Sequence, residues 1–479
     1  MSLLRRWNSL VSAFLGDDPI ERKKILILVL SFFAVIGGYT VIKEFKDTVF
    51  MSVVGLDYQP KAKIMAIFLL FPLVFLYSRL VDILQRHQVL IFMSTAYASI
   101  GLVLAYFLGH PTIGLPNTDT SPWRLFGWIF YFFCEAYSPF VLSVLWSFVN
   151  SVTTPDSVKN GYVTFTIASK IGGMFAASIS WYLLNLQCSG RTICSDAGMF
   201  QIIFTGMSLL LCFIPLVVLY LVRVIPKTHM VGYKKAYQYD EKKEKENKQD
   251  LGFWRDAWRT FKGMFSGLYV ILRYPYVFGI FLMLFFWDIV NATFNYMRLG
   301  VVRETATGAV RMGEDLFSQV FFMHLIGLVI VLVGTKTLVS FIGMRRSLVM
   351  IPVTIGSVVF VYLFSGGAFP IWIAFVIMRA FNYAFAYPLR EGLYIPTTKD
   401  TKFKAKTWID SFGSKIAKAS GSSYIMLSQQ VVGIGLIGAL PLNIAFYGVI
   451  VACWAIVAGL LGRKYEQVVA SNEIVGAVQ

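Results

Sequence analysis

The sequence predicts an all-α membrane protein with about twelve transmembrane helices in two six-helix halves. Two observations carry this prediction. The 479 residues are 57% hydrophobic and only 14% charged, and the apolar residues gather in stretches of about 20, the length that crosses a bilayer as a helix. No long stretch of the chain lacks such segments, so we expect one membrane-embedded protein and not several soluble domains.

The apolar segments fall into two sets of six. The predicted spans lie at residues 25–43, 62–82, 88–108, 123–149, 161–185, 199–224, 273–297, 317–338, 346–365, 370–388, 411–436 and 440–462. An even number of spans places both termini on the same side of the membrane. Roughly 30 Lys and Arg residues fall on that side and roughly 9 on the other, which predicts cytoplasmic termini.

The basic residues fit this topology and not a nucleic-acid partner. The formal net charge is +17, but the excess lies in short loops and one linker beside the spans, and no soluble basic domain is present to bind nucleic acid. The first apolar segment follows Arg22-Lys23-Lys24, is long enough to span, and has no convincing cleavage site after it. We expect an uncleaved first helix, a multi-pass protein in the lipid bilayer and, in a bacterium, the inner membrane.

A polar stretch divides the chain in the middle. Residues 1–225 form the predicted amino-terminal half, 226–270 a cytoplasmic linker, and 271–479 the carboxy-terminal half. The linker contains the amphipathic segment Phe253–Trp258, whose tryptophans and arginine predict an interfacial helix, although a solvated spacer has the same composition.

Charged residues within or beside the spans are the strongest functional signal. A charge at the centre of a bilayer costs about 3 kcal/mol on insertion scales, so several together indicate the path of a charged solute. These residues are Lys43, Glu44, Lys46, Asp47, Glu135, Lys170, Asp288, Arg379, Lys415 and Lys418.

Motifs for energy-driven pumping and for catalysis are missing from the sequence. It contains no Gly-x-x-x-x-Gly-Lys-Ser/Thr loop for ATP hydrolysis, no Gly-x-Ser-x-Gly elbow, and no histidines at metal-ligand spacing. We therefore expect a secondary carrier, with no cofactor and no metal, and not an enzyme; protein partners are left open.

The first charged cluster stands where the first predicted span ends, in Lys43-Glu44-Phe45-Lys46-Asp47-Thr48. On a helix, Lys43 shares a face with Lys46 and Asp47. Either Lys43 and Asp47 form a salt bridge, or a lysine remains available to an anion. The preceding Gly37-Gly38 permits close helix packing or bending.

Two carboxylates occupy the middle of later spans. Glu135 lies among aromatic residues of the fourth span and is expected to face a cavity, where it pairs with a lysine or carries a proton. Asp288 of the seventh span begins a polar stripe with Asn291, Asn295 and Arg298 at helical spacing. Such a stripe lines water or substrate, or forms an interhelical network.

A basic string leads into the eleventh span. Lys404, Lys406 and Lys415 stand among small residues that would let a polyanion approach the backbone, and positive charge in a low-dielectric funnel attracts phosphate. Anchoring by the positive-inside rule is the alternative, and it accounts less well for Lys415 than for lysines nearer the loop.

The two halves and their short basic loops resemble the major facilitator architecture, in which substrate binds between halves. Several motifs further resemble the ATP/ADP translocase type of nucleotide transporter found in intracellular bacteria and plastids. The matching segments, which are spread over nearly the whole chain, are Lys46-Asp47-Thr48, Glu135 with Ser143–Trp146, Asn150–Asp156, and Tyr394–Asp410.

This resemblance implies a nucleotide exchanger of major-facilitator-like fold. Carried over by position, Lys46, Glu135, Asp288 and either Lys404 or Lys406 are the expected substrate-binding residues, and Asn150 belongs to a further matching motif. Aromatic candidates for stacking on the base are Tyr39, Tyr137 and Trp287.

The chain departs from the family pattern in several places. Asp288 stands where the exchangers usually have glutamate, Gly37-Gly38-Tyr39 replaces Phe-Asn-Tyr, and the tenth span lacks a lysine-containing polar segment. Exchange of ATP or a related nucleotide for ADP by alternating access is the leading hypothesis. The alternatives are a proton-coupled importer of a nucleotide or an NAD-type dinucleotide, and an exporter of amphipathic compounds.

Cys188 and Cys194 fall in one short loop on the non-cytoplasmic side. A local disulfide and two thiols are both compatible with this spacing.

Overall fold

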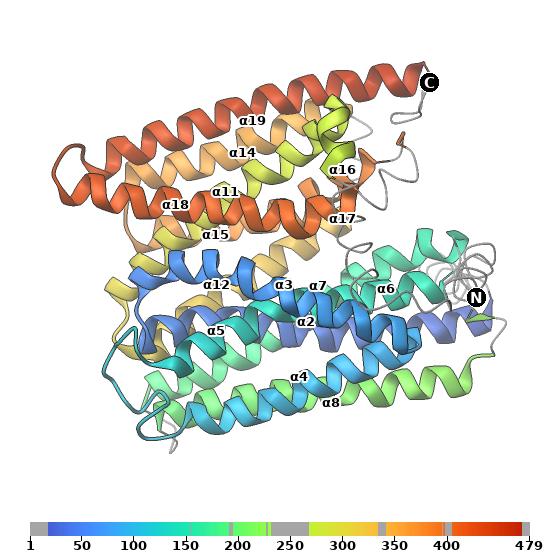
Figure 1. The fold of residues 1–479 in the computed structure, drawn as a ribbon, viewed down its shortest axis with the longest axis horizontal. Helices are drawn as coiled ribbons and strands as arrows, with labels where there is room; N and C mark the ends of the chain where they lie inside the picture. The colour runs from blue at the N-terminus through green and yellow to red at the C-terminus, as the bar shows by residue number, and fades with distance from the viewer. Residues whose placement is uncertain are drawn as a thin grey trace, which may run out of the picture. The chain divides into compact units, whose positions relative to one another are not determined.

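The structure is a computed structural model that describes most of the chain as a set of long helices (Figure 1). The described residues are 18–153, 155–190, 195–226, 229–230, 268–333, 342–394, 396–397 and 405–471. No β-strand occurs in these ranges, so the predicted all-α fold is confirmed. The linker's interfacial helix and Cys194 lie outside the described residues.

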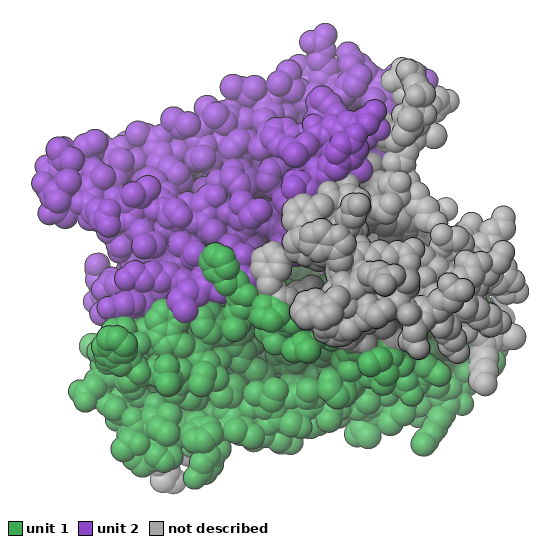
Figure 2. Space-filling view, in the orientation of Figure 1, with its two compact units in different colours: residues 1–56, 68–250, 306–325 green, residues 57–67, 251–305, 326–479 purple. Residues whose placement is uncertain are grey.

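The helices belong to two compact units (Figure 2). Unit 1 comprises residues 1–56, 68–250 and 306–325, and unit 2 comprises 57–67, 251–305 and 326–479. Each unit thus takes one short segment from the opposite half of the sequence. The predicted division at 226–270 stays a prediction.

Unit 1 contains the helices of the first half and the start of one from the second. In chain order they are α2 (Pro19–Val53), most of α3 (Gln59–Ile83), α4 (Arg86–Leu108), α5 (Leu125–Tyr137), the π-helical turn η2 (Ser138–Leu142), α6 (Ser143–Val152), α7 (Pro155–Cys188), α8 (Asp196–Val224) and the first part of α12 (Gly308–Val333). Helix α2 packs against α5, α7 and α8, and α4 runs beside α8 (Figure 1).

Unit 2 has a comparable organisation around α11 (Pro275–Thr305), which packs against α15, α18 and α19. A short 3-10 turn, η1 (Leu56–Tyr58), precedes α3. The remaining elements are α14 (Met344–Ser365), α15 (Ala368–Phe381), the π-helical turn η4 (Asn382–Ala386), α16 (Tyr387–Gly392), α17 (Lys406–Trp408), the π-helical turn η6 (Ile409–Gly413), α18 (Ser414–Gly433) and α19 (Ala439–Ala470). Helices α14 and α19 lie side by side (Figure 1).

Ten helical segments of the described residues are long and apolar enough to cross a membrane. The two remaining predicted spans, 62–82 and 411–436, coincide with α3 and with η6 followed by α18. Every predicted span therefore overlaps a helix, and the protein is an integral, multi-pass membrane protein.

The first helix is longer than its hydropathy predicts. Helix α2 starts at Pro19, where the Asp18 side chain accepts a hydrogen bond of 3.0 Å from the Ile20 amide, and it continues to Val53. The predicted end at residue 43 was wrong. The charged cluster lies inside the helix, because contacts with other side chains compensate charges that a hydropathy window only penalises.

Close backbone contact between α2 and α7 depends on glycine. A methyl group added at Gly172 would lie 2.4 Å from the carbonyl oxygen of Phe33, and one added at Gly37 would lie 3.3 Å from the carbonyl oxygen of Gly172. Small residues let the two backbones approach, as anticipated from Gly37-Gly38.

We predict that Gly172→Ala lowers the free energy of unfolding by about 2 kcal/mol, because a backbone carbonyl cannot move aside as a flexible side chain can. Gly206→Ala on α8 is the matched control, since nothing lies within 4 Å of the added methyl group. Thermal unfolding of the purified chain in detergent measures both. Equal stability of the two variants would show that the α2–α7 contact does not need this glycine.

Candidate binding site

Lys46 and Glu135 form an ion pair between two helices of unit 1. Lys46 projects from α2 and Glu135 from α5, and the lysine Nζ lies 2.9 Å from Glu135 Oε2 and 4.0 Å from Asp47 Oδ1. The ammonium also lies 4.9 Å from the centre of the Tyr131 ring. Of the two roles expected for Glu135, pairing with a lysine is the one that this structure contains.

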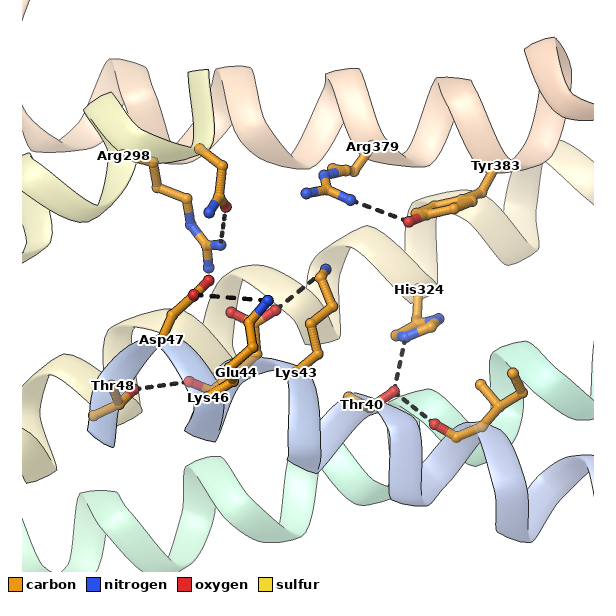
Figure 3. A network of polar contacts seen from close by, with 12 residues as sticks. Thr40, Lys43, Glu44, Lys46, Asp47, Thr48, Arg298, His324, Arg379 and Tyr383 are labelled. Atoms are coloured by element: carbon orange, nitrogen blue, oxygen red, sulfur yellow. Dashed lines mark hydrogen bonds and ion pairs between the residues drawn. The ribbon is translucent and has the colours of Figure 1, made fainter. Parts of the chain in front are cut away.

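The neighbouring residues of α2 continue the polar network (Figure 3). Lys43 Nζ lies 3.3 Å from Glu44 Oε1, and the Thr48 hydroxyl donates a 3.0 Å hydrogen bond to the Glu44 carbonyl. Glu44 and Asp47 are almost completely buried. The cluster is therefore an internal network of alternating charges, and Glu44 has a larger part in it than the sequence indicated.

Helix α12 adds a buried histidine to unit 1. The Nε2 atom of His324 lies 3.4 Å from the Thr40 hydroxyl, which itself donates to the Ile36 carbonyl (Figure 3). The His324 ring also lies against Gly173 of α7, where an added methyl group would meet it at 2.4 Å. The sequence indicates no role for His324, because the residues around it in space come from distant positions in the chain.

A π-helical turn follows Glu135 directly. Helix α5 ends at Tyr137, and η2 contains Pro139, which has no amide hydrogen to donate to the helix ladder. Turns of this kind are frequent at functional sites. Two similar turns occur in unit 2: η4, between α15 and α16, and η6, just before α18.

The polar stripe of α11 is buried along its length. Asp288 is 5% exposed, Asn291 8%, Asn295 7% and Arg298 0%. Asp288 Oδ2 accepts a 2.5 Å hydrogen bond from the Ser414 hydroxyl of α18, and Asn295 Oδ1 accepts one of 3.2 Å from Arg298. Both contacts are polar contacts within unit 2, and Asn291 Oδ1 has no hydrogen-bond partner among the described residues.

The basic string is only partly described. Lys404 lies outside the described residues, whereas Lys406 forms an ion pair with Glu391 and lies 5.4 Å from the centre of the Tyr394 ring. Glu391, Tyr394 and Asp410 line a small recess with neighbouring apolar side chains. Lys415 is half-buried at the start of α18.

The aromatic candidates are mostly packed inside the protein. Tyr137 is fully buried and donates a 2.9 Å hydrogen bond to the Val35 carbonyl, and its ring lies 6.1 Å from that of Tyr39. Trp287 is 4% exposed. Of these three, Tyr39 is the most accessible and remains the clearest candidate for contact with a base.

Two further predicted residues lie beyond the reach of the structure. The side chain of Asn150 is outside the described ones, and so is Cys194, so the bridge between Cys188 and Cys194 stays a prediction. Cys188 itself is exposed at the end of α7.

Lys24 makes more contacts than its sequence position, in the basic segment before the first span, indicates. It is fully buried and donates to Glu21 Oε1 at 2.7 Å and to the carbonyls of Val152 and His229 at 2.9 Å each. Asp18, Glu21 and His229 also come close enough together to hold a metal ion. The sequence did not reveal this group, and the contacts of His229 with Asp18 and Glu21, at 3.5 and 3.6 Å, together with the Lys24–Glu21 ion pair, account for it.

Comparison with known proteins places this helical arrangement in a family. The family model described as "TLC ATP/ADP transporter" matches residues 5–465, which is almost the whole chain. The chain belongs to the TLC ATP/ADP transporter family. Its expected resemblance to nucleotide translocases is thereby confirmed, and so is its assignment as a transporter and not an enzyme.

Relatives from plastids and from Rickettsia are similar to this chain, two of them over most of their length. ADP,ATP carrier protein 1 of Rickettsia prowazekii is 20% identical, with 95% of this chain and 96% of that protein aligned. ADP,ATP carrier protein 2 of Arabidopsis thaliana chloroplasts is 24% identical, over 96% of this chain and 77% of that protein. The plastidic ATP/ADP-transporter of Solanum tuberosum is 28% identical over a shorter region, 37% of this chain and 31% of that protein.

Solved transporter structures share the fold at low sequence identity. The partially occluded, inward-open xylose transporter XylE of E. coli aligns with a TM-score of 0.57 at 12% identity, over 92% of this chain and 96% of that one. A POT family transporter aligns with a TM-score of 0.56 at 12% identity, over 94% of this chain and 98% of that one. The predicted major-facilitator-like architecture is confirmed.

We predict that Lys46→Met destabilises the protein by about 2 kcal/mol, because removing one partner of a largely buried pair leaves the other charge uncompensated. The double variant Lys46→Met with Glu135→Gln should recover most of this loss, since neither charge remains. Thermal unfolding of the unmodified chain, Lys46→Met, Glu135→Gln and the double variant measures the interaction energy between the two side chains.

Lys464→Met is the control, because Lys464 is exposed on α19. A double variant that is no more stable than Lys46→Met would show that the two side chains are not energetically coupled.

Proposed function

We propose that this protein exchanges ATP, or a closely related nucleotide, for ADP across the membrane by alternating access. Family membership and relatives whose names specify ADP,ATP carriers support this proposal. The observation that carries it is the partly buried ion pair between Lys46 of α2 and Glu135 of α5, in which the lysine has a carboxylate partner that an anion can replace.

The chemistry of such a pair suits a polyanionic cargo. A nucleotide phosphate competes with Glu135 for the Lys46 ammonium. Binding therefore replaces one ion pair of Lys46 with another and does not leave the lysine unpaired. When the nucleotide leaves, Glu135 forms its ion pair with Lys46 again. The empty carrier is thereby stable, and the same lysine is available to the next nucleotide.

Asp288 and Lys406 complete the proposed set of substrate-binding residues. Ser414 donates to Asp288 and Glu391 pairs with Lys406, so each charged group has a protein partner that a substrate group can replace. Because Asp288 is a carboxylate, we propose that it contacts donor groups of the nucleotide, such as ribose hydroxyls or the base, and not the phosphates. Lys404 is proposed as a phosphate contact from the same basic string.

We further propose that the protein resides in a bacterial inner membrane with both termini in the cytoplasm. The excess of Lys and Arg in the loops on the side of the termini supports this orientation, and the Rickettsia relatives support a bacterial setting.

The experiment is uptake of labelled ATP into proteoliposomes that contain the purified chain. Vesicles preloaded with ADP should take up ATP at least about tenfold faster than empty vesicles, because an obligate exchanger returns across the membrane with its site occupied. An imposed pH gradient should leave the rate unchanged.

Equal uptake by loaded and empty vesicles would contradict exchange. Uptake into empty vesicles that responds to the pH gradient would instead favour a proton-coupled importer.

A further inference from the structure

A buried arginine of unit 2 has a charge that the described protein does not compensate. Arg379 lies in α15 and is 5% exposed, and no described carboxylate forms an ion pair with it. Its Nη1 donates a 3.0 Å hydrogen bond to the Tyr383 hydroxyl, and its Nε has no hydrogen-bond partner among the described residues (Figure 3).

The position of Arg379 makes this arrangement costly. It lies eleven residues beyond the first residue of α15, which corresponds to roughly 16 Å of helix and thus to about the middle of the hydrocarbon layer. A guanidinium does not lose its proton in proteins, so it cannot escape the cost by becoming neutral. A lipid headgroup does not reach this depth, and no described carboxylate pairs with Arg379, so the position suits a negatively charged solute.

A second arginine converges on the same aromatic ring. The guanidinium carbon of Arg298, on α11, lies 3.6 Å from the centre of the Phe375 ring, and that of Arg379 lies 5.3 Å from it. Arg298 and Phe375 are both fully buried. The ring restricts the orientation of both guanidinium groups, so two permanent positive charges lie against one buried side chain of unit 2.

A second polar side chain of the same span also has an atom that lacks a partner in the described part of the chain. The side-chain oxygen of Asn382 is buried without a hydrogen-bond partner among the described residues, and Asn382 begins the π-helical turn η4. Unmet hydrogen-bonding capacity beside Arg379 is expensive unless a ligand uses it.

We propose that Arg379, with Arg298 beside the shared Phe375 ring, binds the phosphate chain of a nucleoside di- or triphosphate. This inference rests on the proposed function and adds two guanidinium groups of unit 2 to its proposed phosphate contacts. Planar guanidinium groups bind phosphate oxygens through two parallel hydrogen bonds, which makes the pair selective for the number of phosphates and indifferent to the base.

The test is binding of ATP, AMP and adenosine to the purified full-length chain and to Arg379→Gln. ATP affinity should fall at least tenfold in the variant, whereas adenosine affinity should change less than twofold. Arg379→Lys, which keeps the charge but loses the planar fork, should lie between the two. Arg346→Gln is the matched control, because Arg346 is exposed on α14 of the same unit.

Stability gives a second readout that a structural role would not reproduce. Ligand-free Arg379→Gln should unfold at the same temperature as the unmodified chain or higher, since the substitution removes an uncompensated charge. An arginine that served only to hold the fold together would lower that temperature when replaced. Unchanged ATP affinity in Arg379→Gln, or equal losses for ATP and adenosine, would overturn the proposal.

Inorganic triphosphate separates this proposal from the proposed function. If the unmodified chain binds triphosphate and Arg379→Gln does not, the anion site stands even where ADP-loaded vesicles show no exchange. If the unmodified chain binds neither triphosphate nor ATP, the anion site is refuted. If the unmodified chain binds and exchanges ATP, and the Arg379→Gln variant is equally active, only the anion site is refuted.

Discussion

The compensation of charge inside apolar helices is the constraint on which the rest of this structure depends. Each unit is built around one long helix, α2 or α11, and each of these helices has polar or charged side chains along its buried length. A bilayer tolerates such side chains only when partners are supplied from neighbouring helices. The packing of α5 against α2, and of α18 against α11, supplies Glu135 and Ser414 respectively.

The charges of the buried cations are fully compensated at some positions and only partly at others. We use this difference to distinguish structural cations from candidate binding residues. Lys24 is fully satisfied by one carboxylate and two backbone carbonyls, which is typical of a structural lysine. Lys46 has a carboxylate partner that an anion can displace, and Arg379 has only a hydroxyl and an aromatic ring. The less completely a buried cation is satisfied, the more strongly it attracts a phosphate.

Much of this organisation could be predicted from the sequence, because hydropathy and the spacing of charges are local signals. Each of the twelve predicted spans overlaps a described helix, and ten described helices are long and apolar enough to cross a membrane. Lys46, Glu135 and Asp288 stand out in the sequence as charges within or beside apolar spans. The partners themselves could not be found, since Lys46 and Glu135 are 89 positions apart and only tertiary packing brings them together. The end of α2 was placed too early because a hydropathy window cannot recognise a charge that is paired.

The sequence indicates no specific role for Arg379, and the reason is a different one. Its neighbours Phe375 and Tyr383 stand four residues before and after it on the same helix face, a spacing that the sequence does contain. What the sequence lacks is any sign that no carboxylate is near. The prolines that accompany π-helical turns, Pro139 within η2 and Pro388 just after η4, are a further signal shared by the fourth and tenth spans. The fourth and tenth spans hold the same place, the fourth, within the two predicted sets of six.

If incompletely compensated cations bind the phosphates of the cargo, an experimental structure of the full-length chain with ATP bound shows it directly. We expect phosphate oxygens within about 3 Å of the Arg379 guanidinium, and Glu135 displaced from Lys46 by a phosphate. Phosphates that lie away from both cations, with the Lys46–Glu135 contact unchanged, would contradict it.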